Sequence, residues 1–223
     1  MELRQLLGVG PGITALIGSG GKTTAMYRLA GELQQLGTVI CTTTTHIFPP
    51  EHLPVLEAPS GNDIAAALAV NPCVCVGRPG AEGKLGPGTL SPAALAELAD
   101  YVLVEADGSR GRPCKAHLDY EPVIPAGTRR TVLVVGAAGF GQPIQEAVHR
   151  VERFCALAGS SPDEWVTMAL LARVIRGEAL GDVVLVNQVE TAEALACARE
   201  LAAQLEQPVV AGSLHGGEWL CVS

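Results

Sequence analysis

Short apolar runs alternate with longer amphipathic stretches along most of the 223-residue chain. Several of the apolar runs are continuous and rich in Val, Ile and Leu, which is typical of sheet strands covered on both faces by helices. We expect strands at residues 13–18, 38–46, 72–77, 101–109, 131–137, 182–188 and 208–214. We expect helices at residues 22–37, 62–70, 91–99, 143–157, 161–176 and 192–205. This alternation predicts an α/β protein with a doubly wound, mainly parallel sheet flanked by helices.

The length and composition fit one domain. The chain is 48% hydrophobic and 17% charged, and no linker separates one part of it from another. We therefore expect a single domain over residues 1–223. The stretch "GRPGAEGKLGPGTL", residues 77–90, is rich in Gly and Pro and predicts an exposed excursion or hairpin.

Charge and cysteine usage narrow the class of protein. Fifteen basic against twenty-three acidic residues give a formal charge of −8, which argues against non-specific nucleic-acid binding. Seven cysteines without a C-x-x-C pair indicate reduced thiols, and no apolar run is long enough to span a membrane. The polar, glycine-broken N-terminus is not a signal peptide, so we expect a cytoplasmic protein. Among the thiols, Cys73 and Cys75 should share one buried face, and Cys114 should be the most exposed.

The stretch "GSGGKTT" lies between the first expected strand and the first expected helix, where a phosphate-binding loop would be found. The common spacing G-x-x-x-x-G-K-[ST] would place a glycine at position 16, which is Leu, but the shorter form G-x-x-G-K-[ST] begins at Gly18. Backbone amides here could cradle phosphates at the helix N-terminus, and a lysine and threonine could reach the γ-phosphate and Mg²⁺. The alternative is a tight turn with a solvated lysine. The predicted nucleotide-binding residues of the loop are Gly18, Ser19, Gly20, Gly21, Lys22, Thr23 and Thr24.

A second polar group follows the strand "YVLVE". Glu105 and Asp107 stand at a strand tip, as in a Walker B segment, and with Thr23 they are the predicted Mg²⁺ ligands. Three cations and a histidine follow within nine residues, namely Arg110, Arg112, Lys115 and His117, together with Ser109. Of these, Arg110, Lys115 and His117 are the functional candidates. Their density suits an anionic substrate or a γ-phosphate, although a turn with solvated charges is the alternative. The predicted catalytic residues are Lys22, Glu105, Asp107, Lys115 and His117.

Two further strand ends carry candidates. The stretch "CTTTTHIFPP" offers the hydroxyls of residues 43–45 for Mg²⁺ or substrate, and His46 as an acid, base or ligand. Near the C-terminus, "VNQVE" parallels the N-K-x-D element that holds a guanine base, with Asn187 and Glu190 as the base contacts. Gln188 replaces the lysine of that element, so the sequence leaves ATP and GTP both open.

Taken in order, "GSGGKTT", "TTTTH", "VEADGSRGRPCKAH", "EPVIP" and "VNQVE" resemble the YqeC family over nearly the whole chain. The resemblance implies a P-loop nucleotide-binding protein that helps to mature selenium-dependent molybdenum hydroxylases or their cofactor. The family motif falls here on Gly18, Gly20, Gly21, Lys22, Thr23, Thr24, His46, Glu105, Asp107, Gly108, Ser109, Lys115 and His117.

The leading hypothesis is an enzyme that binds and hydrolyses ATP or GTP with Mg²⁺ during this maturation. Its partners would be the nucleotide and a selenium-dependent molybdenum hydroxylase or its maturation factors, with no nucleic acid and no membrane. Alternatives are a nucleotide-switched metallochaperone that docks on a client enzyme, and a small-molecule kinase or ligase of the Mur type, which the shortened loop suggests.

Overall fold

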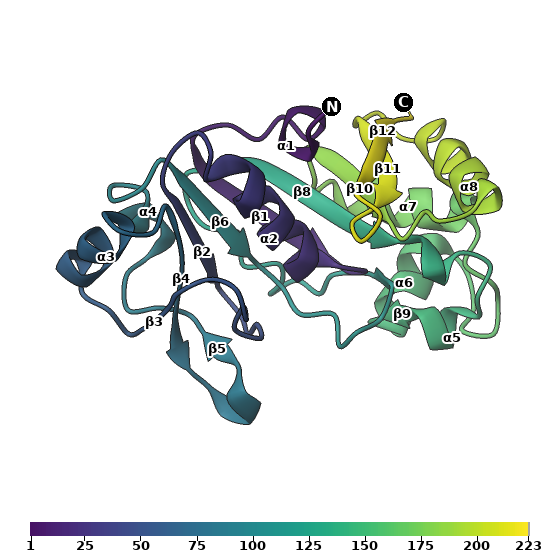
Figure 1. Cartoon of the computed structure of the whole chain (residues 1–223). Coiled ribbons are helices and arrows are strands. Elements are labelled where there is room, and N and C mark those ends of the chain that lie inside the picture. The colour runs from purple at the N-terminus through teal and green to yellow at the C-terminus, as the bar shows by residue number, and fades with distance from the viewer. Residues whose placement is uncertain (223) are drawn as a thin grey trace.

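The apolar runs form one twisted, mainly parallel sheet of ten strands in the computed structural model, which describes residues 1–222 (Figure 1). The strand order is β12-β11-β10-β8-β1-β6-β2-β4-β3, with β5 paired to β4. The strands are β1 (Gly12–Gly18), β2 (Val39–Thr43), β3 (Val55–Glu57), β4 (Cys73–Pro79), β5 (Leu85–Gly86), β6 (Tyr101–Glu105), β8 (Thr128–Gly136), β10 (Val183–Asn187), β11 (Val209–Ser213) and β12 (Glu218–Cys221). Only the pairs β11–β12 and β4–β5 are antiparallel, so the predicted α/β class with a mainly parallel sheet is confirmed.

Helices cover both faces of this sheet. They are α1 (Leu3–Leu6), α2 (Lys22–Leu33), α3 (Gly61–Leu68), α4 (Pro92–Leu95), α5 (Ile144–Ala147), α6 (Val151–Ala158), α7 (Met168–Glu178) and α8 (Ala192–Ala202). The first two pack on one face, against Leu16 of β1 and Leu103 of β6. On the opposite face α3 and α4 cover one end of the sheet, and α6, α7 and α8 cover the other (Figure 1). Side chains alternate along a strand, so Ala15 and Ile17 of β1 face the helices α6, α7 and α8, whereas Leu16 faces α1 and α2.

The sheet places the carboxyl ends of four neighbouring strands side by side. Strand β1 lies between β8 and β6, and β6 lies between β1 and β2. All three pairings are parallel, so the carboxyl ends of these strands meet at one edge. Glu105, at the end of β6, is paired in register with Leu16 of β1 and Thr43 of β2. The end of β6, which carries Glu105, and the end of β2, which carries the threonine stretch, therefore lie on the same side of the sheet as the first loop.

Several element boundaries differ from the prediction. The expected helix over residues 143–157 is two helices, because the short strand β9 (Val148–His149) pairs with β7 (Cys114–Lys115) and Arg150 has left-handed backbone. The expected helix over residues 161–176 begins only at Met168, where Thr167 caps the first turn by accepting a hydrogen bond from the Leu170 amide. Strand β2 ends at Thr43 and β6 ends at Glu105, earlier than their apolar and threonine-rich patterns indicated.

The hairpin and the buried cysteines agree with the prediction, whereas the exposure of one cysteine does not. Residues 77–90 form a hairpin through β4 and β5, as predicted, and Ser91 caps α4. Cys73 and Cys75 lie in the core with Cys41. The prediction that Cys114 is the most exposed thiol is wrong: its side chain packs under the sheet edge at 1% exposure, and Cys221 is the exposed one. Within residues 1–222, none of the helices combines the length and apolar character that a membrane crossing requires.

Candidate functional site

The loop after β1 is shaped by three glycines with positive φ. Gly18, Gly20 and Gly21 have φ values of 90°, 84° and 122°, which residues with a side chain rarely adopt. A Cβ at Gly20 would overlap the backbone of Gly136, and one at Gly18 would overlap the carbonyl oxygen of Val134. The Ser19 amide donates to that same carbonyl at 2.9 Å. The loop is therefore pressed against the end of β8 and held in a form that only glycine permits.

Lys22 begins helix α2 and turns back under this loop. Its Nζ donates to the Gly18 carbonyl at 2.7 Å and lies 3.1 Å from Asp107 Oδ1 and 3.8 Å from Glu105 Oε1. Its side chain is only 3% exposed. The alternative of a solvated lysine is excluded, because this ammonium group is buried among the loop and the two carboxylates.

Thr23 and Glu105 form a second contact between the loop and β6. The Thr23 hydroxyl donates to Glu105 Oε2 at 2.6 Å. Burial raises the pKa of Glu105, and the charge of Lys22 and the Thr23 hydrogen bond oppose that rise without cancelling it. A hydroxyl and a carboxylate oxygen side by side are the kind of ligands that Mg²⁺ takes from proteins. Among residues 1–222 no cluster of three or more His, Cys, Asp or Glu side chains has metal-binding geometry, so these two oxygens would need phosphate or water to complete a metal shell.

Asp107 is the centre of a buried ionic network. Its Oδ2 accepts hydrogen bonds from the Gly18 amide at 2.9 Å and from His117 Nε2 at 2.8 Å, and lies 3.1 Å from Lys115 Nζ. Burial alone would raise its pKa, but the His117 hydrogen bond and the charges of Lys22 and Lys115 lower the pKa to about 2. Asp107 is therefore ionised and holds three cationic groups around the first loop.

His117 continues the network to helix α7. Its Nδ1 lies 2.7 Å from Glu178 Oε2, while its backbone amide donates to Glu178 Oε1. Both ring nitrogens face carboxylates, which only accept when ionised, so both nitrogens carry a proton. Burial lowers the pKa of His117, but the hydrogen bonds to Asp107 and Glu178 outweigh it and the pKa is raised. His117 is an imidazolium that joins the loop to α7.

Lys115 is fixed from three sides and does not face the open space around the loop. Besides Asp107 it contacts the Gly108 carbonyl at 2.7 Å and Glu121 Oε2 at 2.8 Å. Glu121 is held in turn by Arg150 Nε at 2.8 Å. The "EPVIP" segment thus contributes a carboxylate to the network, and Lys115 reaches the loop only through Asp107.

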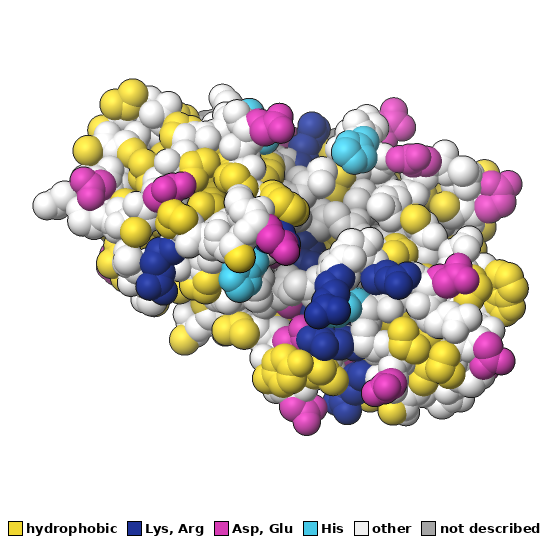
Figure 2. All heavy atoms as spheres, turned by 90° about the horizontal axis from the view of Figure 1, so that it is seen from below, with side chains coloured by type: hydrophobic (Ala, Val, Ile, Leu, Met, Phe, Trp, Pro, Cys, Tyr) yellow, Lys and Arg dark blue, Asp and Glu magenta, His cyan; other side chains and the backbone are white. Residues whose placement is uncertain are grey.

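A cavity of about 520 Å³ opens directly beside the loop. The start of α2 and Glu105 form one wall, and the turn over residues 108–111 forms another. The third wall is the segment after β2 together with Lys84 of the hairpin. Its lining residues are Gly21, Lys22, Thr23, Thr24, Thr45, His46, Ile47, Phe48, Lys84, Glu105, Gly108, Ser109, Arg110 and Gly111. In the view from below, Figure 2 shows Lys and Arg side chains gathered beside a hollow on this face.

The threonine stretch divides into two parts. The Thr43 hydroxyl donates to the Glu105 carbonyl at 2.8 Å, and the Thr44 hydroxyl donates to the Val123 carbonyl at 2.9 Å. These two hydroxyls serve the backbone, whereas Thr45 and His46 line the cavity. The loop and the threonine stretch therefore meet at one site.

Asn187 and Glu190, the two predicted base contacts, lie in different surroundings. The Asn187 side-chain amide donates to the Gly20 carbonyl at 2.7 Å and accepts from the Leu214 amide at 3.0 Å, so it fastens the first loop to β10 and the end of β11. Glu190 is exposed and accepts a hydrogen bond from the Ser213 hydroxyl at 3.2 Å. Neither residue lines the cavity beside Thr23 and Glu105.

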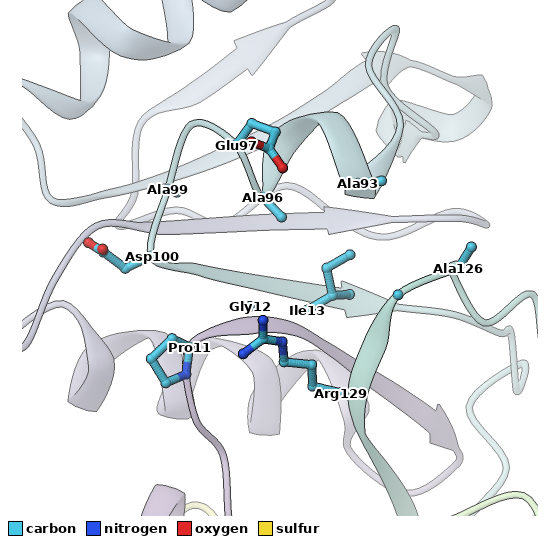
Figure 3. A pocket seen from close by; sticks show the side chains of 11 residues that line it. Pro11, Gly12, Ile13, Ala93, Ala96, Glu97, Ala99, Asp100, Ala126 and Arg129 are labelled. Atoms are coloured by element: carbon cyan, nitrogen blue, oxygen red, sulfur yellow. The ribbon is translucent and has the colours of Figure 1, made fainter.

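A separate cavity of about 440 Å³ lies at the opposite end of the strands, by the amino ends of β1 and β6 (Figure 3). Small residues form most of its lining, and the Arg129 side chain lies over Gly12. The Asp100 carboxylate is already engaged by the Thr38 amide and hydroxyl at 2.8 and 2.9 Å. None of the residues that line this cavity was a predicted site residue.

Sequence reasoning missed Glu178, Phe48 and Lys84. Glu178 ends α7, where the helix dipole disfavours a carboxylate, and this mismatch was the available signal that it has a cationic partner. Phe48 and Lys84 reach the cavity from separate loops and carry no motif, so only the fold brings them together.

The fold and the site define an α/β protein in which a glycine-rich, lysine-bearing loop meets acidic strand ends at the carboxyl edge of a parallel sheet. The model of the YqeC protein family matches residues 14–152, which contain the loop, the acidic strand end and the members of the ionic network other than Glu178. A curated relative from Escherichia coli (strain K12), named Uncharacterized protein YqeC, is 35% identical over 177 residues, 74% of this chain and 68% of its own. The chain belongs to the YqeC family.

Proposed function

We propose that this protein binds a nucleoside triphosphate with Mg²⁺ at the loop of residues 18–24, within a P-loop type of fold. The observation that carries the proposal is the joint position of Lys22, Thr23 and Glu105 beneath a glycine loop at the start of a twelve-residue helix. Loop amides and the helix N-terminus favour a phosphate, and a buried lysine balances its charge. The cavity beside them, at about 520 Å³, is of the size that small-molecule ligands occupy.

Mg²⁺ would be held by Thr23 Oγ1 and Glu105, with phosphate oxygens and water as its remaining ligands. Both residues line the cavity, whereas Asp107 is fully buried and surrounded by Lys22, Lys115 and His117. Mg²⁺ supplies charge neutralisation on the phosphates when bound. We therefore assign Asp107 to holding Lys22 and the Gly18 amide in place, and Lys115 and His117 to positioning Asp107.

The reaction that this site supports best is hydrolysis of ATP or GTP, in which Lys22 and the loop amides stabilise the charge that develops on the γ-phosphate. Glu105 is the one carboxylate among the residues that line the cavity, so it is the group that would orient an attacking water there. In the YqeC context we place this activity in the maturation of selenium-dependent molybdenum hydroxylases or their cofactor, as the resemblance of the motifs implies.

Phosphate release from ATP and GTP, with and without Mg²⁺, tests the proposal. We expect Mg²⁺-dependent release by the wild type, and a fall of about 100-fold in Glu105→Gln, which keeps the size of the side chain but not its charge. Thr23→Ala should raise the Mg²⁺ concentration needed for half-maximal release. Release that is the same without Mg²⁺, or that survives both substitutions unchanged, would exclude this assignment.

A second candidate, transfer of the γ-phosphoryl group to a small molecule, is favoured by the extent of the cavity beyond Thr23 and Glu105. It predicts slow phosphate release with water alone. Co-purification with a molybdenum hydroxylase, measured with and without a non-hydrolysable nucleotide, addresses the maturation role and the switch-like alternative separately. Complex formation that needs the nucleotide supports a switch, and the absence of a complex in both states contradicts the role in maturation.

A further inference from the structure

The cavity extends past the groups that a triphosphate and Mg²⁺ would use. Beyond Thr23 and Glu105 lies a wall made by the segment after β2 and by the hairpin of β4 and β5. Ile47 and Leu85 exchange backbone hydrogen bonds at 2.9 and 2.8 Å, which joins these two segments into one surface. His46 lies close to the hairpin, because its Cδ2 would be only 3.5 Å from a Cβ placed on Gly80. The wall is thus a fixed part of the structure.

Arg110 supplies a positive charge to this part of the cavity. Arg110 lines the cavity and is exposed, its charge contributes to the lowered pKa of the nearby His149, and its backbone has a φ of 51°. A non-glycine residue in the left-handed region carries backbone strain, which persists mainly at sites of function. Glu105 is the one acidic residue among those that line the cavity, and it faces Lys22 and Thr23. An anion could therefore bind beside Arg110 without meeting an unpaired carboxylate.

Phe48 supplies a flat apolar surface on the same wall. Phe48 is 62% exposed and lines the cavity. Its backbone is held in place, because the Tyr27 hydroxyl donates to the Phe48 carbonyl at 3.2 Å. Lys84 Nζ lies 5.1 Å from the ring centroid and also forms an ion pair with Glu82 Oε2 at 3.0 Å, so a paired cation stands beside the ring.

We propose that the space walled by His46, Phe48, Lys84 and Arg110 binds a second ligand, a small anion with a flat ring, next to the nucleotide phosphates. The carboxylate or phosphate of this ligand pairs with Arg110, and its ring lies against Phe48, beside the Lys84–Glu82 ion pair. The position next to the γ-phosphate rests on the proposed function. The anion site itself rests only on the residues that wall it.

Binding of four probes by calorimetry and ligand-observed NMR tests the site. Phenyl phosphate and benzoate carry a ring and an anion, inorganic phosphate lacks the ring, and benzyl alcohol lacks the charge. Each is titrated into the full-length protein saturated with a non-hydrolysable Mg²⁺–nucleotide analogue. We expect phenyl phosphate, benzoate or both to bind at least about tenfold more tightly than inorganic phosphate and benzyl alcohol. Equal affinity for all four, or no binding of either ring anion, would overturn the proposal.

Variants locate the binding. Arg110→Asn keeps a residue that tolerates left-handed backbone and should weaken the ring anions by about tenfold without changing nucleotide affinity. Phe48→Ala should weaken both ring anions and leave inorganic phosphate unchanged. Arg112→Asn is the matched control, because Arg112 is in the same turn but lines a different cavity. If Arg110→Asn and Arg112→Asn lose equal affinity for the ring anions, or if the probes displace the nucleotide, the assignment is contradicted.

The same titrations separate this proposal from the proposed function. If the wild type binds nucleotide but neither ring anion, only the second site fails. If it binds no nucleotide, the proposed function fails, and titration of the nucleotide-free protein then decides the anion site by its sensitivity to Arg110→Asn.

Discussion

At the scale of single residues, Asp107 determines how the site is held together. One carboxylate accepts from a loop amide and pairs with two lysines and a histidine while it is fully buried. Such a carboxylate stabilises the fold only as long as all of its partners remain, because an unpaired buried charge is costly. The loop shape and the position of Lys22 thus depend on residues as distant in sequence as His117.

The loop glycines can be tested one at a time. Gly20→Ala should lower the free energy of unfolding by about 2 kcal/mol, since its φ is 84° and a Cβ would overlap Gly136. Gly31→Ala, in the last turn of α2 and with open space around an added Cβ, should instead raise it by about 0.5–1 kcal/mol. Urea denaturation gives both values. A loop that accepts alanine at position 20 as readily as α2 accepts it at position 31 would show that the packing against β8 is not needed.

The buried thiol of Cys114 gives a prediction that depends on pH. Burial raises its pKa to about 12, so at pH 8 only about one thiol in 10⁴ is the reactive thiolate, and this fraction grows as the pH rises. Iodoacetamide at pH 8, followed by peptide mass spectrometry, should modify exposed Cys221 in the native protein and Cys114 only after unfolding. Modification of Cys114 in the native state at the rate of Cys221 would place Cys114 on the surface.

At the scale of elements, helix α7 is fastened to the site by its last residue. Glu178 accepts from both the ring and the backbone of His117, although α7 packs on the far side of the sheet from α2. The network therefore joins elements on opposite faces through the carboxyl ends of the strands. Movement of the loop between β1 and α2 would therefore be transmitted to α7 through Asp107 and His117.

Removing this contact should be costly. Glu178→Ala leaves the protonated His117 with one carboxylate instead of two, and we expect a loss of about 3 kcal/mol in the free energy of unfolding. Glu200→Ala, on the exposed side of α8, is the control and should change it by less than about 0.5 kcal/mol. Thermal and urea denaturation measure both. If the two variants are equally stable, His117 does not depend on Glu178.

The elements also show how far the sequence predicts this structure. Continuous apolar runs such as residues 131–137 identify parallel strands, because burial on both faces leaves no position for a polar residue. The break at Val148 was not predictable, because "PIQEAVHRVERFCAL" has helical periodicity and only pairing with Cys114 and Lys115 makes residues 148–149 a strand. Strands β3 and β12 were not predicted, because they have only three and four residues and are partly exposed, which leaves little periodic signal.

The site was predictable to the extent that motifs mark it. Loop and strand-end motifs place Lys22, Thr23 and Glu105 together because parallel strands end at one edge. The exposure of Cys114 was misjudged because a polar sequence context does not reveal that β7 pairs with β9 beneath the turn. Glu178, Phe48 and Lys84 depend on tertiary packing, which leaves no local pattern in the sequence.

At the scale of the whole molecule, one sheet runs from β12 at one edge to β3 at the other, and three hydrophobic clusters line its two faces. The central strands β1 and β8 contribute residues to clusters on both faces. Because the clusters share strands, one part of the sheet cannot lose its packing without exposing the next.

This arrangement predicts a single cooperative unfolding transition. Scanning calorimetry should give a calorimetric enthalpy equal to the van't Hoff enthalpy, in one peak for the whole chain. Saturating Mg²⁺–nucleotide should move this peak to higher temperature without splitting it. Two resolved peaks, with only one shifted by nucleotide, would divide the chain into independent units and contradict a single nucleotide-binding domain.

The central claim is that the loop around Lys22 binds a nucleoside triphosphate, and titration calorimetry with non-hydrolysable ATP and GTP analogues tests it most directly. We predict Mg²⁺-dependent binding by the wild type and a loss of about thirtyfold or more in Lys22→Gln, since a buried charge-assisted contact to phosphate is removed. Arg28→Ala, on the exposed face of the same helix, should bind like the wild type. If neither analogue binds to the wild type, or if Lys22→Gln binds as tightly as Arg28→Ala, the loop is not the nucleotide site.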